Sequence, residues 1–323
     1  MDKIKLYKEI ETLSLELGFV DFGVAHVSEL MQDKKFYTNA MDRGYFASMS
    51  YLHRNLDKRF NPANLVEGAQ SILVFLSPYS LPYKDKNSVT GIAEYALGKD
   101  YHKVIKDKLF VIMEHIKELY PNFSGRAFTD SAPILERAWA EKAGLGFIGQ
   151  NNFLISPSSG IKNLIGVIVA NVPLPDKFSL YPTLQQSIEK AKNGCKTCNK
   201  CLKACKNGSL VAPYTLDARK CTSYLTIESK NIKEQMQSEG IEHFAGWYYG
   251  CDICLNVCPW NGKNKEGWME YREYLDILKK ADYSWWCNLS DKEFKDIFKD
   301  SPLLRGGKEN ILAAIEVNLT NIN

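Results

Sequence analysis

Apolar and polar residues recur along the N-terminal part of the chain with the two periods that distinguish helices from strands. Residues 3–17 have apolar side chains at helical spacing, and residues 100–119 repeat that spacing, which predicts two amphipathic helices. Residues 19–27 and 71–79 are short runs rich in apolar side chains, which predicts strands. Helical and extended segments therefore follow one another from the N-terminus onward.

The same alternation continues beyond this point. Residues 125–130 predict a short strand, and residues 131–144 predict a helix with one apolar face. Residues 152–156 and 164–172 predict two further strands joined by a Pro-Ser-Ser-Gly turn. An alternating order of strands and helices predicts a mixed α/β (α+β) domain over residues 1–180.

Residues 142–152, KAGLGFIGQNN, contain the spacing G-x-G-x-x-G of a dinucleotide-binding turn. That turn requires a strand before the glycines, a helix after them and an acidic residue about 20 positions later. Here the glycines follow a predicted helix and precede a predicted strand, and the next acidic residue is Asp176. We therefore interpret Gly144 as a helix cap and Gly146 and Gly149 as turn residues.

Composition is that of an ordinary globular protein. The 323 residues are 45% hydrophobic and 24% charged, with a formal net charge of +3. This charge permits contact with an anionic partner, although a sequence-independent DNA binder is usually more basic. No apolar run approaches the roughly 18 residues of a membrane span, and the N-terminus lacks a signal-peptide core. We expect a cytoplasmic protein whose cysteines are thiols or metal ligands.

Eight of the nine cysteines lie close together in the chain. Four of them follow C-x2-C-x2-C-x3-C, the spacing of a bacterial ferredoxin run: Cys195, Cys198, Cys201 and Cys205. A second group has the spacing C-x2-C-x3-C and is followed by proline: Cys251, Cys254 and Cys258. Cys221 can supply the ligand that this second group lacks, which completes two sites of four thiolates each.

The spacing also predicts how the eight thiolates divide. Three closely spaced sulfurs fit one face of an iron–sulfur cube, and the last cysteine of each run serves the other cluster. One 4Fe–4S cluster is assigned to Cys195, Cys198, Cys201 and Cys258. The other is assigned to Cys205, Cys221, Cys251 and Cys254. Two structural zinc sites are the alternative, but zinc normally uses two C-x2-C pairs rather than a triple run. The ninth cysteine, Cys287, fits an apolar core position.

Three segments resemble the epoxyqueuosine reductase family of queuosine biosynthesis: FTDSAPILERAWAEKAGLGFIGQNNFLI, CTSYLTIE and GCDICLNVCPWN. The resemblance extends over nearly the whole chain, and the first two segments carry more of it than the cysteine spacing alone. It implies an α/β cobalamin-binding catalytic domain over residues 1–180 and a ferredoxin-like module for two 4Fe–4S clusters over residues 181–265. A helical C-terminal extension over residues 266–323 completes the expected architecture.

The resemblance implies reduction of epoxyqueuosine to queuosine at the wobble position of tRNA. An epoxide on a cyclopentane ring becomes an alkene with net loss of water, and cob(I)alamin fed by the two clusters is the reductant. The implied partners are the tRNA anticodon stem-loop and a low-potential electron donor such as flavodoxin or ferredoxin. We expect a monomer that does not engage a membrane. Two alternatives stay open, a ferredoxin fusion that only transfers electrons and a corrinoid reductive dehalogenase.

Asp130 is the candidate proton donor for the alkoxide that leaves when the epoxide opens. It lies at a predicted strand-to-helix junction, where sheet enzymes often place catalytic groups. The alternative is that Asp130 only N-caps the following helix, whose N-terminus would lower the pKa of the carboxyl. Burial over an apolar corrinoid would raise that pKa instead. The residues leave the two roles balanced, and the resemblance favours catalysis.

Further candidates come from the residues around these motifs. Asp100 to His102 begin a D-x-H-x-x-G cobalt-ligand motif, but Ile105 occupies its glycine position. The resemblance implies a cobalt without a protein ligand and places Tyr101 and His102 near the substrate. Candidate cofactor contacts, each of which also fits a turn, cap or surface role, are Arg59, Asp130, Gly149, Gln150, Asn151, Ser223 and Thr226. Arg305 and Lys308 are candidates for contacts with tRNA phosphates.

Overall fold

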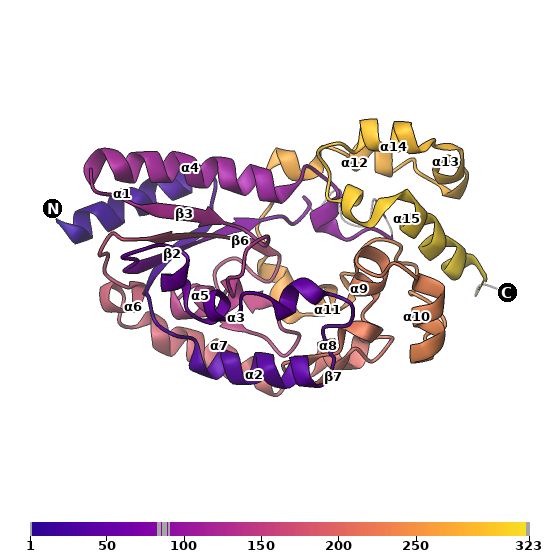
Figure 1. Cartoon of the computed structure of the whole chain (residues 1–323), viewed down its shortest axis with the longest axis horizontal. Helices are drawn as coiled ribbons and strands as arrows, with labels where there is room; N and C mark the ends of the chain where they lie inside the picture. Colours follow the sequence, from indigo (N-terminus) through magenta and orange to yellow (C-terminus); the bar gives the residue numbers. More distant parts are fainter. Residues whose placement is uncertain (1, 83–84, 86–88, 90, 321–323) are drawn as a thin grey trace.

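The fold is centred on a four-stranded antiparallel sheet with strand order β1-β2-β6-β3 (Figure 1). This computed structural model describes residues 2–320 except 83–84, 86–88 and 90. The strands are β1 (Asp21–His26), β2 (Ser71–Pro78), β3 (Gly125–Phe128) and β6 (Asn163–Ala170). Every residue of β2 is buried, which explains its continuous apolar run.

Helices cover both faces of the sheet. On one face lie α1 (Lys3–Glu16) and α4 (Tyr101–Leu119), whose apolar stripes pack against alternate strand residues such as Phe22, Phe75 and Ile168. On the other face α5 (Glu136–Lys142) packs its Trp139 against the intervening strand residues. The period of two along each strand therefore supplies two separate cores, one for each layer of helices.

Three expectations about this domain need correction. The helix predicted over residues 131–144 begins only at Glu136, because the N-cap residue Leu135 has non-helical backbone angles (φ −89°, ψ 77°). The sheet is antiparallel throughout, so the α+β form of the predicted mixed class applies. Residues 152–156 pair with a strand that the sequence pattern missed, since β5 (Leu154–Ile155) and β4 (Phe147–Ile148) form a separate small sheet.

The glycine turn has the structural role expected for it. Gly144 follows the last turn of α5 with a φ of 73°, as a helix-terminating glycine does. A Cβ at Gly146 would lie 2.1 Å from the backbone oxygen of Ile155, so only glycine lets β4 and β5 approach here.

The cysteine-rich segment forms a set of short elements beside the sheet, seen on the right and below it in Figure 1. Its helices are α7 (Leu184–Lys196), α8 (Lys200–Ala204), α9 (Thr222–Ile227), α10 (Ile232–Glu239) and α11 (Ile253–Asn256). A small hairpin joins β7 (Leu210–Ala212) to β8 (Thr215–Leu216). Cys205 directly follows α8, and Cys258 is the N-cap residue of the 3-10 segment η6 (Pro259–Lys263). Contact between α8 and α11 brings both cysteine runs into one region.

The C-terminal helices pack against other parts of the chain as well as against one another. They are α12 (Leu275–Leu278), α13 (Tyr283–Asn288), α14 (Asp291–Ile297) and α15 (Leu303–Thr320). Their buried residues form one apolar cluster with Ile92, Ala96 and Tyr249. The extension therefore packs onto both the catalytic part and the cysteine-rich part of the chain.

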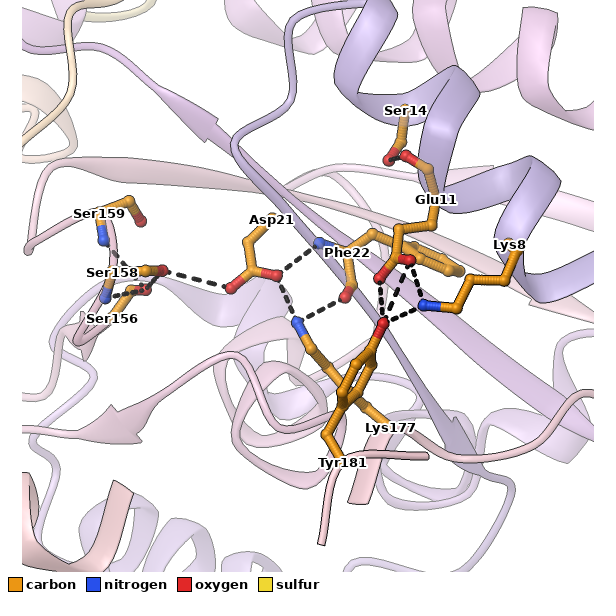
Figure 2. A network of polar contacts seen from close by, with 10 residues as sticks. All are labelled: Lys8, Glu11, Ser14, Asp21, Phe22, Ser156, Ser158, Ser159, Lys177 and Tyr181. Atoms are coloured by element: carbon orange, nitrogen blue, oxygen red, sulfur yellow. Dashed lines mark hydrogen bonds and ion pairs between the residues drawn. The ribbon is translucent and has the colours of Figure 1, made fainter. Parts of the chain in front are cut away.

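A polar network fastens the outer edge of the sheet (Figure 2). The Lys177 ammonium, at the start of α6 (Lys177–Leu180), donates hydrogen bonds to the Asp21 carboxylate and, at 2.8 Å, to the carbonyl of Phe22. Tyr181 donates to Glu11 of α1 at 3.1 Å. Strand β1 is thereby tied to α1 and to α6.

The remaining described helices before the sheet's second strand are α2 (Met31–Asp42) and α3 (Leu56–Phe60), with a 3-10 turn, η1 (Ser50–His53), between them. Among the described residues, no helix is long and apolar enough to span a bilayer.

Candidate active site

Asp130 lies in the loop between β3 and α5. Its φ of 53° is a left-handed value that aspartate tolerates better than most residues. The Asp130 backbone N–H donates a 2.5 Å hydrogen bond to Oε1 of Glu136, which stabilises the loop in this conformation. The N-cap residue of α5 is Leu135, so the alternative in which Asp130 caps the helix is wrong.

The first turn of α4 meets Asp130. His102 Nε2 lies 3.6 Å from Asp130 Oδ2, and the Tyr101 hydroxyl donates a hydrogen bond to the same oxygen. The other ring nitrogen of His102, Nδ1, lies 2.6 Å from Oδ1 of the N-cap residue Asp100. The rings of Tyr101 and His102 stack with their centroids 4.2 Å apart. Two carboxylates therefore flank one imidazole.

This arrangement determines which of the two side chains, His102 or Asp130, is protonated. Burial opposes protonation of His102, but its hydrogen bonds to Asp100 and Asp130 outweigh burial and raise its pKa to about 9. Burial also works to raise the pKa of Asp130, yet the hydrogen bonds from His102 and Tyr101 hold that pKa below its ordinary value. At neutral pH His102 is therefore the imidazolium and Asp130 the carboxylate.

The Asp130 carboxylate is open to solvent, and we use the name hollow for the exposed region at Asp130, His102, Tyr51 and Arg305. Its side chain is 63% exposed, although burial is the strongest single influence on its pKa. The two observations agree because water reaches the carboxylate directly while protein surrounds it at longer range. The neighbouring Glu136 has its pKa raised to about 8, first by burial and then by the charge of Asp130.

Arg305 lies at the rim of this hollow. Its Nε donates a 2.5 Å hydrogen bond to Glu228, and its guanidinium carbon is 5.8 Å from the centroid of the Tyr51 ring. Asp130 is an electrostatic neighbour of both Tyr51 and Arg305. Lys308, by contrast, donates to the Leu289 carbonyl and pairs with an aspartate of α14. Of the two basic candidates, only Arg305 is near the hollow.

The eight thiols separate into two groups. The thiols that act on the pKa of Cys258 are Cys195, Cys201 and Cys198. Those that act on the pKa of Cys254 are Cys251, Cys221 and Cys205. We call the first set the outer group and the second the inner group. This division agrees with the crossed assignment drawn from the spacing, which stays a prediction, and four thiols in each group match the donor chemistry of a 4Fe–4S cluster.

The inner group lies on the side of Asp130. Cys221 is the N-cap residue of α9, whose C-cap residue is Glu228, the partner of Arg305. The buried Tyr95 has both Asp130 and Asp252 among its electrostatic neighbours, and Asp252 lies between two inner-group cysteines. The inner group is therefore the group that α9 and Tyr95 connect to the surroundings of Asp130.

Gln150 and Asn151 connect the sheet domain to the cysteine segments. Gln150 Nε2 donates to the Cys195 carbonyl at 2.5 Å, and Asn151 Nδ2 donates to the Cys254 carbonyl at 3.3 Å. One residue thus contacts each group of thiols. These two candidate cofactor contacts therefore lie next to the backbone of cysteines that are predicted cluster ligands. The Oε1 of Gln150 is buried without a hydrogen-bond partner among the described residues.

The other candidate cofactor contacts are spread around the same region. Arg59 is buried, donates to the Tyr51 carbonyl at 3.3 Å and leaves its Nε without a partner among the described residues. Thr226 accepts a hydrogen bond from the Gly250 N–H at 3.0 Å, next to Cys251. Ser223 interacts through its backbone with the Cys221 thiol. At Gly149 a Cβ would lie 2.5 Å from the Ile155 side chain, so packing alone accounts for that glycine.

The sequence reading missed a buried ionic network behind the inner group. Lys162 Nζ lies 2.5 Å from Glu94 Oε1 and 4.0 Å from Asp252 Oδ2, and the Lys162 side chain is 2% exposed. The Glu94 backbone N–H donates to Asp252 at 2.9 Å. In the sequence, the one indication of this network was the position of Asp252 between Cys251 and Cys254. Cys287, expected in the core, is exposed, because the neighbouring Trp286 takes the buried position on α13.

Comparison with known proteins supports the two parts of this site separately. Residues 194–261 match the family model described as a 4Fe-4S double cluster binding domain. This match confirms the expectation of two 4Fe–4S clusters over the zinc alternative. Residues 59–131 match the model described as epoxyqueuosine reductase QueG, DUF1730, a range that ends one residue after Asp130.

Whole-chain relatives point the same way. The epoxyqueuosine reductase of Leadbetterella byssophila is 35% identical over 96% of this chain and 98% of the relative. That of Escherichia coli strain K12 is 32% identical over 99% of this chain and 82% of the relative.

The solved epoxyqueuosine reductase from Bacillus subtilis has 25% identity, covers 98% of this chain and 82% of its own, and superposes with a TM-score of 0.82. The fold, the cysteine-rich segment and the full-length identity agree, and this chain belongs to the epoxyqueuosine reductase family.

Proposed function

We propose that this protein reduces epoxyqueuosine in tRNA to queuosine. The observation that carries the proposal is that a proton-holding array, formed by Asp130, His102 and Tyr101, lies on the same side as the inner group of thiols, since the buried Tyr95 neighbours both Asp130 and Asp252. The array supplies protons and the thiol groups hold clusters that supply electrons, and this reaction consumes both. A protein that only transferred electrons would have no need for the array.

The chemistry balances as a reductive removal of oxygen. Loss of the epoxide oxygen as water, with formation of the carbon–carbon double bond, consumes two electrons and two protons. Both carbon–oxygen bonds of the epoxide break. The oxygen that departs from carbon must be protonated, because an alkoxide is a poor leaving group in a site that excludes water.

His102 and Asp130 divide the work of proton transfer. The imidazolium of His102 holds one proton at neutral pH, and the Asp130 carboxylate beside it is the group open to the hollow. Asp130 accepts this proton from Nε2 and then passes it to the departing oxygen. Solvent reprotonates His102, and the same relay delivers the second proton. The hydrogen bonds from Tyr101 and from the Asp130 backbone to Glu136 orient the carboxylate during transfer. Support comes from the Bacillus subtilis enzyme, in which a loop with a catalytic aspartate is described.

The residues around the hollow fit a cobalamin. The corrinoid is rimmed by amide groups, and Arg59 Nε and Gln150 Oε1 are a buried donor and a buried acceptor without partners among the described residues. When bound, cobalamin supplies the strong reductant that an epoxide carbon requires. Asp130, Ser223, Thr226, Asn151 and Gly149 remain candidate contacts on the same basis.

The remaining assignments rest on the same function. The substrate is a tRNA anticodon stem-loop, as in a related solved epoxyqueuosine reductase in complex with a tRNA-Tyr epoxyqueuosine-modified stem loop. Arg305 at the rim is the proposed phosphate contact. The electron donor is an external low-potential carrier such as flavodoxin or ferredoxin. We propose a cytoplasmic monomer with the catalytic domain over residues 1–180, the cluster module over 181–265 and the helical extension over 266–323.

The decisive experiment is mass spectrometry of tRNA. Anaerobically purified protein loaded with cobalamin and iron is reduced chemically and incubated with tRNA that contains epoxyqueuosine. The expected product nucleoside is lighter by one oxygen atom. A corrinoid protein that reduces an organohalide but leaves this tRNA unchanged would point to the dehalogenase alternative.

A further inference from the structure

The first cysteine run is embedded in a continuous stretch of positive charge. Between Glu189 and Asp217 the sequence has no acidic residue and six lysines: Lys190, Lys192, Lys196, Lys200, Lys203 and Lys206. All of these except Lys192 are exposed. Within the described part of the chain, the one ion pair of these lysines joins Lys192 to Glu141, at 2.8 Å. The charge is therefore available to a partner.

These lysines lie in sequence beside three of the four outer-group cysteines, Cys195, Cys198 and Cys201. Lys196 and Lys200 flank the segment that holds Cys198, and Lys203 follows Cys201 on α8. The outer-group thiols are only partly buried. A cluster held there lies near the surface, which is where electron transfer from another protein requires it.

An apolar centre accompanies the charged rim. Tyr214, in the turn between β7 and β8, is 39% exposed and has Cys195 and Lys192 among its electrostatic neighbours. Val211 on β7 is 43% exposed. Apolar and aromatic residues bordered by charged ones are the usual anatomy of a protein–protein interface. We call Lys196, Lys200, Lys203, Val211 and Tyr214 the lysine face.

We propose that the lysine face docks an acidic one-electron carrier protein, and that electrons enter through the outer group. This inference rests on the proposed function, since it names where the donor of that reaction binds. The inner group lies towards Asp130, so the outer group is the end of the pair that remains for a donor. A surface of single positive sign speeds association with an acidic partner.

RNA phosphate is the other anion that such a surface could attract. The docking of a carrier is favoured because the modified base must reach the hollow at Asp130, where Arg305 already provides a basic contact. Tyr214 and Val211 also provide apolar area next to Cys195 that a phosphate backbone does not need. The experiment separates the two partners.

The redox step at this face is a single electron transfer. The reduced carrier loses one electron, and the oxidised outer cluster gains it, which changes the cluster charge from 2+ to 1+. No bond forms or breaks, and a second reduced carrier supplies the second electron of each turnover.

Charge reversal tests the docking surface. Lys200→Glu and Lys203→Glu are combined in one variant, and Lys292→Glu with Lys295→Glu on α14 gives a control with the same change in net charge at exposed positions. Stopped-flow absorbance follows cluster reduction by reduced flavodoxin, an acidic carrier, without tRNA and over a series of salt concentrations. Photoreduction with 5-deazaflavin, which needs no docking, checks that both clusters are present and reducible.

We expect the α8 variant to be reduced by flavodoxin at least tenfold more slowly at low salt, with a weaker dependence on salt than the wild type. The α14 variant should match the wild type, and 5-deazaflavin should reduce all three equally. Equal slowing in both variants overturns the proposal, as does an unchanged flavodoxin rate accompanied by weaker tRNA binding in the α8 variant. Failure of the tRNA mass-spectrometry experiment would instead reject the proposed function, because the flavodoxin assay contains no tRNA.

Discussion

His102 holds its ring between two carboxylates, with Nδ1 2.6 Å from Asp100 Oδ1 and Nε2 3.6 Å from Asp130 Oδ2. Asp130 is thereby ionised in the resting protein, and the proton is held on the neighbouring imidazole of His102. A carboxylate kept ionised is a poor acid by itself, but it is a good relay when an imidazolium lies beside it. The pair, rather than either side chain alone, is the proton source that the proposed reaction needs.

Asp130→Asn tests the relay. Asparagine tolerates the left-handed backbone at this position and preserves the size of the side chain, so cobalamin and both clusters should still load. Turnover of epoxyqueuosine-containing tRNA should fall roughly 10²- to 10⁴-fold, the range for loss of general acid–base catalysis. Product is quantified by mass spectrometry at matched cofactor content. Near-normal turnover would contradict a catalytic role for Asp130.

The pH profile tests the proton on His102. Its pKa is raised to about 9 from an ordinary 6.5, so the active protonated form persists until pH approaches 9 and is lost above it. The profile of kcat/KM should therefore show a basic limb near pH 9. By linkage, the protonated ring also stabilises the fold fully below pH 6.5, and this contribution disappears as pH rises from 6.5 through 9.

Asp100→Asn provides the matched variant for that profile. Asparagine is nearly as good an N-cap as aspartate, so α4 should remain intact. The variant lacks the negative charge that raises the pKa of His102, so the basic limb should move to lower pH. An unchanged limb in Asp100→Asn would mean that another group titrates there.

Cys258→Ala tests the division of the thiols. Loss of this residue should damage the outer cluster, held with Cys195, Cys198 and Cys201, and leave the inner cluster intact. The wild type should contain about eight irons and eight labile sulfides. Electron paramagnetic resonance of the reduced protein resolves the two clusters. The exposed Cys287→Ala is the control and should change neither signal, whereas loss of the inner cluster in Cys258→Ala would reverse the assignment.

Lys162→Met tests the buried ionic network. The variant leaves Glu94 and Asp252 without their buried cation, and the free energy of unfolding should fall by roughly 3 kcal/mol, as for removal of one partner of a buried pair. Urea unfolding followed by fluorescence measures the loss. Adding Glu94→Gln to Lys162→Met should restore part of the stability, because it removes one uncompensated charge. A double variant less stable than Lys162→Met would argue against charge as the cause.

Binding of tRNA should depend on salt only moderately. The net charge of +3 and the single basic candidate near the hollow predict few phosphate contacts, so the anticodon loop with its modified base must supply the selectivity. Filter binding at about 0.15 M salt compares an epoxyqueuosine-containing stem-loop with an unrelated RNA duplex. Equal affinity for the two would contradict base recognition in the hollow.

Local rules along the chain determined much of this protein. Apolar periodicity placed α1, α4, β1 and β2 close to their observed bounds, because each buries one face or stripe of side chains against the sheet. The cysteine spacing predicted two cluster sites, which the match to a double-cluster domain confirms. It also predicted a crossed division of the ligands, since a short turn can present only three sulfurs to one cube, and that division stays a prediction. Asp130 could be named as a candidate, but its two possible roles could not be separated from sequence.

Tertiary structure decided what depends on residues far apart in the chain. The late start of α5 removed the helix-cap role of Asp130, and the approach of His102 from α4 determined its ionisation. The periodicity of the sequence does not reveal which residues come close together in the fold. The pKa of a side chain depends on the charges that lie near it in space. For the same reason Lys162 was not recognised as the partner of Glu94, and Arg305 was not distinguished from Lys308. The sequence identified the candidate chemical groups, and the packing of the fold determined which of them lie next to one another.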